Sequence, residues 1–171
     1  MVMELVGAAA SVAGILAFAG QAISGVSKVV TFFNGMKKAR KKTEMLVKDL
    51  SSLKETLENV NVLLRFLESD EQQYSPISIL FVIGKPVEDC TIDIAEMEKV
   101  VEEFSLGANS FKLTSLSKRT EIALKQLPSD EIRQKILLHY QRINGSIALF
   151  NQYINFHSLR KSHIRLLSDT S

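Results

Sequence analysis

The sequence predicts an all-α domain, a bundle of about four to five helices, from three observations. Apolar residues recur at alternating steps of three and four through most of the 171 residues, the period of helices packed on one face. Apolar residues make up 46% and charged residues 23% of the chain, a composition typical of a folded globular domain. Only three prolines interrupt it. The N-terminal, second and C-terminal helices are expected to be long.

The first helix is expected within residues 1–34, because the 23 residues of the stretch 5–27 carry no charge. As a helix, this stretch would be about 35 Å long, enough to cross a hydrocarbon core of roughly 30 Å. Its small residues recur at steps of four, as in Ala9, Ala13 and Ala17, which lets helix backbones approach closely. The stretch is therefore either a tightly packed core helix or a membrane helix, and both interpretations can hold in different states.

Two further apolar stripes lie in the middle of the chain. The longer predicts a helix of about thirty residues and consists of Leu46, Leu50, Leu53, Leu57, Val60, Leu64 and Leu67. The shorter predicts a third helix from Asp89 to Phe104, with Cys90 on the apolar face, where a thiol behaves as inert core. Residues 70–87 contain two prolines that bracket an apolar run, which a short strand and a short helix would produce alike. We expect a connector of at most one or two helical turns that packs its apolar side chains on the bundle, with a contact surface as the alternative.

Two more helices are expected in the C-terminal third. A short one is predicted over residues 115–127 and a long one over 129–158, with Ser129 as its N-cap. The apolar stripe of the long helix is Ile132, Ile136, Tyr140, Ile143, Ile147, Phe150, Ile154 and His157. Gly145 interrupts this helix at a cost of roughly 1 kcal/mol relative to alanine, unless a neighbour packs there. Residues 159–171 are expected to form a basic tail or linker.

Charge is distributed unevenly, although the formal net charge is only +2. Residues 1–48 and 106–171 are basic and residues 49–105 are acidic, so these blocks pair within the fold or face different partners. The densest basic run is Lys37, Lys38, Arg40, Lys41 and Lys42. It contains no interleaved aromatic residues, so no nucleic-acid partner is expected.

The sequence contains no recognisable catalytic or cofactor-binding pattern. The three histidines show no metal-ligand spacing, and no glycine-rich phosphate loop follows a strand pattern. We therefore expect no enzyme activity, no cofactor and no metal. A single cysteine excludes an internal disulfide and favours a reducing cytosolic compartment.

The opening of the chain resembles the N-terminus of the fungal HeLo-like family. The similar block runs from Glu4 to Leu16 (ELVGAAASVAGIL) and is followed by Gly20 and Gln21. The likeness continues through the charged segment, the leucine-rich helix and the acidic helix, and it covers residues 3–157. Residues 70–87 depart from the family pattern, which leaves their role open.

This resemblance implies a function. HeLo-like domains are N-terminal effector domains of fungal STAND or NLR-type immune receptors, or of proteins with an amyloid-forming signalling tail. They are similar to the helical bundles of necroptotic pseudokinases and plant resistance proteins. When activated, they oligomerise, move from the cytoplasm to the plasma membrane and cause cell death, as in heterokaryon incompatibility. The resemblance thus implies a membrane-targeting cell-death domain over residues 1–158, with an upstream NLR or amyloid-signalling protein. No amyloid motif is visible, so we expect the chain to continue beyond Ser171.

The resemblance also assigns residues to the membrane. The N-terminal helix would insert, and its assigned residues are Glu4, Leu5, Gly7, Ala9, Ala13, Gly14, Leu16, Ala17, Phe18, Gly20 and Gly25. The basic run from Lys37 to Lys42 would meet anionic lipid head groups at about 1 kcal/mol for each basic residue near the surface, with a solvated turn as the alternative. Self-association is expected on activation. The alternative function is a non-lytic oligomerisation or protein-interaction module whose first helix never leaves the bundle.

Overall fold

A computed structural model describes residues 11–35, 40–69, 77–108 and 129–168. Within these ranges every residue except Ser11 is helical. The helices are α2 (Val12–Gly35), α3 (Arg40–Ser69), α4 (Ile77–Ala108) and α6 (Ser129–Ser168). The prediction of an all-α bundle is confirmed. The short helix predicted over residues 115–127 lies outside the described ranges.

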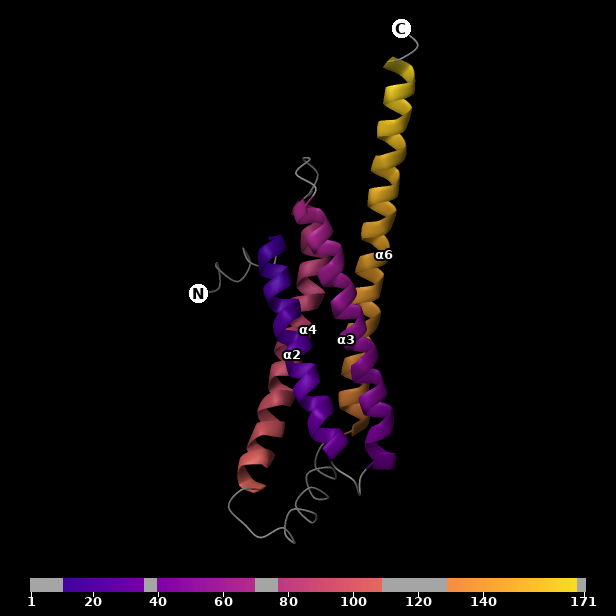
Figure 1. The fold of residues 1–171 in the computed structure, drawn as a ribbon. Helices are drawn as coiled ribbons and strands as arrows, with labels where there is room; N and C mark the ends of the chain where they lie inside the picture. The colour runs from indigo at the N-terminus through magenta and orange to yellow at the C-terminus, as the bar shows by residue number, and fades with distance from the viewer. Residues whose placement is uncertain (1–10, 36–39, 70–76, 109–128, 169–171) are drawn as a thin grey trace.

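The four described helices pack lengthwise against one another (Figure 1). α2 packs against α3 and α4, and α6 packs against the same two helices, so α2 and α6 occupy opposite corners of the bundle. α2 and α4 point in the same direction, whereas α3 and α6 point in the opposite one (Figure 1). The core lies where the apolar stripes of all four helices meet.

The stripes predicted for the two central helices are confirmed. In α3 the buried members are Leu46, Leu50, Leu53, Leu57, Val60 and Leu64. In α4, Cys90, Ile94 and Val101 are buried, and Met97 packs against the same core. These heptad-spaced residues face inward because positions three and four apart lie on one side of a helix.

The connector predicted over residues 70–87 is wrong from Ile77 onward, because α4 begins there and continues through Pro86. A proline lacks the N–H that would bond to the carbonyl four residues earlier, here that of Val82. Ser146 on α6 compensates, since its Oγ lies 2.9 Å from the Val82 carbonyl oxygen and also 2.9 Å from that of Arg142. The hydroxyl has one proton, so Ser146 donates to one of these two carbonyls at a time, and the freed Val82 carbonyl thereby has a donor from another helix within reach.

α6 also differs from its prediction in two ways. It extends to Ser168, so the predicted tail is helical up to that residue. Its inward face also differs by one position, because His139 is buried where Tyr140 was expected. His139 Nε2 lies 2.7 Å from Asp93 Oδ2 on α4, so the imidazole donates a hydrogen bond to the carboxylate.

Ion pairs join α6 to both of its neighbours. Arg133 Nε lies 2.8 Å from Asp49 Oδ2 on α3, and Arg142 Nη2 lies 3.1 Å from Asp89 Oδ2 on α4. Asp89 Oδ1 also lies 3.0 Å from Lys85 Nζ. Burial opposes ionisation of Asp89, but the hydrogen bond from Lys85 and the charges of Lys85 and Arg142 outweigh it and lower the pKa of this carboxyl.

Candidate functional site

The candidate site is α2 together with the surfaces of α3 and α4 that cover it. α2 begins at Val12 because Ser11 caps it. The Gly14 N–H donates to Ser11 Oγ at 3.0 Å, and the Ile15 N–H donates to the Ser11 carbonyl at 3.0 Å. By length and composition, α2 is the one helix within the described ranges that could cross a membrane, and 33% of its most apolar 18-residue stretch is buried.

One face of α2 forms part of the core. Its buried residues are Ile15, Ala19, Ala22, Gly25, Val26, Val29 and Phe33. The opposite face carries small or polar residues, among them Ala17, Gln21, Ser24 and Lys28, and these are exposed. The large apolar side chains of α2 are therefore turned into the bundle, and its outward face resembles that of a soluble helix.

Gly25 packs tightly against α4. A Cβ atom built on Gly25 would lie only 2.6 Å from Ile94 Cγ2 and 3.1 Å from Glu98 Oε2. Carbon atoms in ordinary contact are separated by about 3.5–4 Å, so only glycine allows this spacing. By contrast, nothing lies within 4 Å of a Cβ built on Gly20, one and a half turns earlier.

A polar contact accompanies this packing nearer the start of α2. Thr91 Oγ1 on α4 lies 3.0 Å from the Phe18 carbonyl oxygen and 2.8 Å from the Val87 carbonyl oxygen of its own helix. The hydroxyl has one proton, so it donates to one of these acceptors at a time. Thr91 is buried, so this hydrogen bond joins the two helices away from water.

The third α2–α4 contact is an ion pair nearer the end of α2. Lys28 Nζ pairs with Glu98 and lies 3.8 Å from Glu102 Oε1. The hydrogen bond and the charge of Glu98 raise the pKa of the Lys28 amine. The three contacts follow one edge of α4, from Thr91 through Ile94 to Glu98.

The structure places the residues assigned to membrane insertion in three environments. Ala13, Ala17 and Gly20 are exposed, whereas Gly25 is buried. Gly14, Leu16 and Phe18 are half-buried. Glu4, Leu5, Gly7 and Ala9 lie outside the described residues. The predicted insertion set is therefore divided between the faces of α2, and the Ala13–Ala17 step of four faces away from the bundle.

The residues assigned to lipid head groups are described only in part. Lys37 and Lys38 lie outside the described residues. The first turn of α3 contains Arg40, Lys41 and Lys42. The side chains of these three residues lie outside the described part of the structure.

Several contacts that hold α2 were missed by the sequence analysis. Ala19 and Ala22 are fully buried, whereas the steps of four between small residues had indicated Ala13 and Ala17 as packing positions. The signal for the buried face was the spacing of the larger residues Ile15, Val26 and Val29. Thr91 and the Lys28 pairs could not be identified, because no local pattern connects residues some seventy positions apart.

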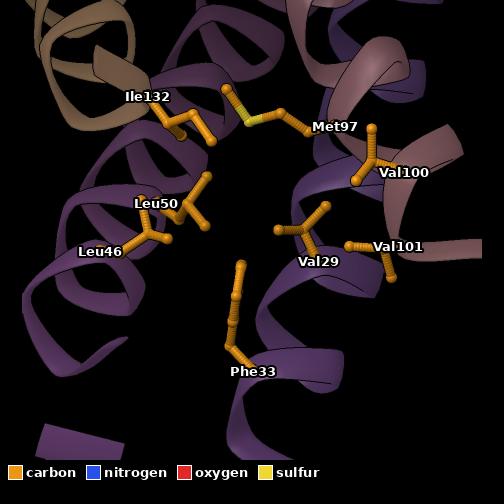
Figure 2. Close-up of a pocket in the computed structure, with 8 residues that line it drawn as sticks. All are labelled: Val29, Phe33, Leu46, Leu50, Met97, Val100, Val101 and Ile132. Carbon is orange, nitrogen blue, oxygen red and sulfur yellow. The ribbon is translucent and has the colours of Figure 1, made fainter. Parts of the chain in front are cut away.

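An apolar hollow lies among the four helices, toward the C-terminal ends of α2 and α4. Its lining residues are Val29, Phe33, Leu46, Leu50, Met97, Val100, Val101 and Ile132. Figure 2 shows these side chains surrounding a common space, with one or more contributed by each described helix. The lining offers no polar side chain that could orient a substrate or move a proton.

Cys90, the single cysteine of the chain, is buried in the described core. Burial, together with the nearby charge of Asp93, raises the pKa of the Cys90 thiol to about 12, so the reactive thiolate is strongly disfavoured. Asp93 in turn is bonded to His139, which ties α4 to α6. Within the described residues, no group of three or more His, Cys, Asp or Glu side chains is arranged to hold a metal ion.

Comparison of the chain with protein-family models, curated proteins and solved structures gives no significant match. The likeness to HeLo-like domains therefore depends on the opening sequence block and the order of the helices.

Proposed function

We propose that this chain is a membrane-targeting effector domain that disrupts the plasma membrane when copies oligomerise, in a cell-death response of the kind its HeLo-like sequence implies. One observation supports the proposal most directly: α2 is long and apolar enough to cross a membrane, yet α3 and α4 cover its large apolar side chains. The domain would remain cytoplasmic while α2 is covered and would reach the membrane once α2 is released.

The composition of α2 favours release into an assembly over insertion as a single helix. Its alanines, glycines and serines gain less from lipid than leucines would, whereas small residues let neighbouring helices pack closely. Lys28 ends the uncharged stretch, so its amine would lie at one membrane surface, near the head groups that the basic run from Lys37 to Lys42 would contact. Several copies would be needed to cover the small-residue faces.

Leakage of a dye from anionic liposomes tests this proposal. The chain should release the dye, and Gly14→Leu or deletion of residues 2–20 should abolish release. Since either change can also unfold the bundle, a reversible tether gives a sharper test. Lys28→Cys with Glu98→Cys, joined by a crosslinker that contains a disulfide, would fasten α2 to α4, because these side chains already form an ion pair.

The tethered protein should not cause leakage, and reduction of the crosslinker should restore leakage. A matched control is the same crosslinker between Lys54→Cys and Glu58→Cys, an ion pair of 3.8 Å within α3 that does not restrain α2. Cys90 should not interfere, because its thiol is buried and its pKa is raised. Full leakage from the tethered protein would refute release of α2.

The non-lytic oligomerisation module makes a different prediction. It expects self-association without lipid binding, since α2 would remain in the bundle in every state. Flotation of the chain with liposomes, with and without anionic lipid, separates the two functions, because only the membrane function requires the protein to rise with the lipid.

A further inference from the structure

The outward face of α6 carries a second heptad-spaced stripe in addition to the one in the core. We call it the outer seam; its steps alternate between four and three, and it comprises Leu138, Arg142, Gly145, Leu149, Gln152, Phe156 and Leu159. Every one of these residues is exposed, and the leucine side chains at 138, 149 and 159 are 52%, 58% and 71% exposed. A sustained 4-3 spacing is the pattern of a helix that pairs with another helix.

Gly145 lies in the middle of the outer seam and has no role in the described bundle. Nothing lies within 4 Å of a Cβ atom built on it, and it is exposed. Glycine is a poor helix former, so its presence inside a 40-residue helix needs a reason. Close approach of another helix is such a reason, because an absent side chain leaves room for a large one.

The outer seam is also placed where another helix can reach it. The C-terminal part of α6 runs past the ends of the other described helices (Figure 1). The seam from Leu138 to Leu159 is about 32 Å long. α6 packs on α3 and α4 mainly through its opposite face. Of the seam residues, Arg142 also contacts the bundle, through its ion pair with Asp89 on α4, and its side chain remains 42% exposed.

An antiparallel copy of α6 fits this surface better than a parallel one. In antiparallel pairs the two alternating seam positions face each other. A single register places Leu149 opposite Gly145 of the other copy, and Phe156 opposite Leu138. The same register sets Arg142 against Gln152, which matches polar with polar. A membrane would instead leave those two polar side chains in lipid.

The charges at the ends of α6 favour the same orientation. Asp130 and Glu131 occupy the first turn, and Arg160 and Lys161 belong to its last turns. Arg133 and Lys135 follow directly, so the start of α6 is close to neutral overall. A parallel pair would bring the two basic ends together, whereas an antiparallel pair separates them. We propose that the outer seam of α6 is a homotypic interface through which two copies of this chain pair antiparallel.

The pairing is inferred from α6 alone and does not require a membrane. Its role in gathering copies before α2 is released depends on the function proposed above. Because pairing is measured in solution without lipid, its failure would leave the liposome results unaffected, and the converse also holds.

Sedimentation equilibrium of the chain, up to about 1 mM because short helix pairs associate weakly, measures the pairing. The key variant is Gly145→Glu. In the monomer it replaces a glycine by a better helix former in open space, so the melting temperature should not fall. In the pair it sets a charge against Leu149, so the Kd should rise by at least about tenfold. Asn151→Glu is the matched control, since Asn151 is exposed on α6 away from the seam.

Disulfide formation tests the register. Chains with Leu138→Cys are mixed with differently tagged chains that carry Phe156→Cys, and the mixture is oxidised. The antiparallel register predicts mixed dimers in excess of either like dimer, because 138 and 156 meet only between copies. The buried Cys90 should not react. Three results would each overturn the proposal. They are a chain that remains monomeric up to the highest concentration, an equal loss of pairing in Gly145→Glu and Asn151→Glu, and an excess of like dimers.

Discussion

Replacing Gly25 with alanine tests whether the close α2–α4 contact determines how readily α2 is released. The added Cβ would lie 2.6 Å from Ile94 Cγ2, about 1 Å closer than ordinary contact allows. Ile94 is buried and β-branched, so its methyl cannot turn aside easily. The helices must therefore separate, and such overpacking typically costs about 1–3 kcal/mol.

Alanine also favours the helix over glycine by about 1 kcal/mol, which offsets part of this cost. Gly20→Ala isolates the offset, because a Cβ at Gly20 meets nothing within 4 Å on the same helix. The two variants gain the same propensity, so the difference between their free energies of unfolding should be about 1–3 kcal/mol, with Gly25→Ala the less stable. For a domain of this size, that corresponds to a difference in Tm on the order of 5 °C.

Two assays follow from this difference. Urea unfolding of both variants measures the contact itself, and equal stabilities would show that Gly25 is not tightly packed against Ile94. Liposome leakage measures its consequence: Gly25→Ala should leak several-fold faster than Gly20→Ala, since each 1.4 kcal/mol shifts a two-state equilibrium about tenfold. A destabilised Gly25→Ala that leaks no faster would refute the claim that this contact restrains α2.

Three further predictions concern other contacts. Thr91→Val removes the hydroxyl that meets the Phe18 carbonyl and should lower the free energy of unfolding in urea by about 1 kcal/mol. The pKa of Asp89 is lowered, so its contribution to stability should be fully present at pH values above its ordinary pKa of 3.8. As the pH falls through that value and below, the free energy of unfolding should decrease by roughly 1 kcal/mol, and Tm measured across an acid titration should fall with it. Cys90, with a pKa of about 12, should not react with a thiol reagent at pH 8 until urea unfolds the chain.

Each of these has a matched control. Thr31→Val should change stability little, because the exposed Thr31 hydroxyl donates to the Ser27 carbonyl of its own helix; an equal loss in both variants would contradict a role for Thr91 between helices. Asp89→Asn should flatten the acid dependence, and an unchanged profile would contradict the pairing with Arg142. Rapid modification of folded Cys90 would contradict its burial.

The parts of the fold that could be predicted from the sequence are those fixed by local spacing. The stripe from Leu46 to Leu64 is buried as expected, because heptad spacing alone determines which side of a helix is apolar. The same argument placed Cys90 and Ile94 in the core. The composition is also consistent with an all-α domain, because few prolines interrupt these stripes.

The errors arose where distant residues determine local structure. Residues 70–87 were expected to form a connector, but α4 runs through Pro86. The Val82 carbonyl that this proline leaves without its usual donor lies 2.9 Å from the hydroxyl of Ser146, sixty positions after the proline. Tyr140 was expected inside, but Asp93 on another helix offers His139 a buried partner. In α2, the step from Ala13 to Ala17 suggested the packing face, whereas the larger residues determine which face is buried.

The corner position of α2 has a consequence for an isolated molecule. Because the major contacts of α2 are with α3 and α4 alone, its departure would expose an apolar groove between those helices, lined by residues such as Leu50 and Ile94. Exposing that apolar surface to water is strongly unfavourable, so α2 should stay packed in the bundle of an isolated molecule. At a membrane where copies are concentrated, release of α2 becomes more favourable. A neighbouring copy can cover the exposed apolar surface while α2 inserts into the lipid. Release of α2 should therefore be suppressed when the protein is dilute.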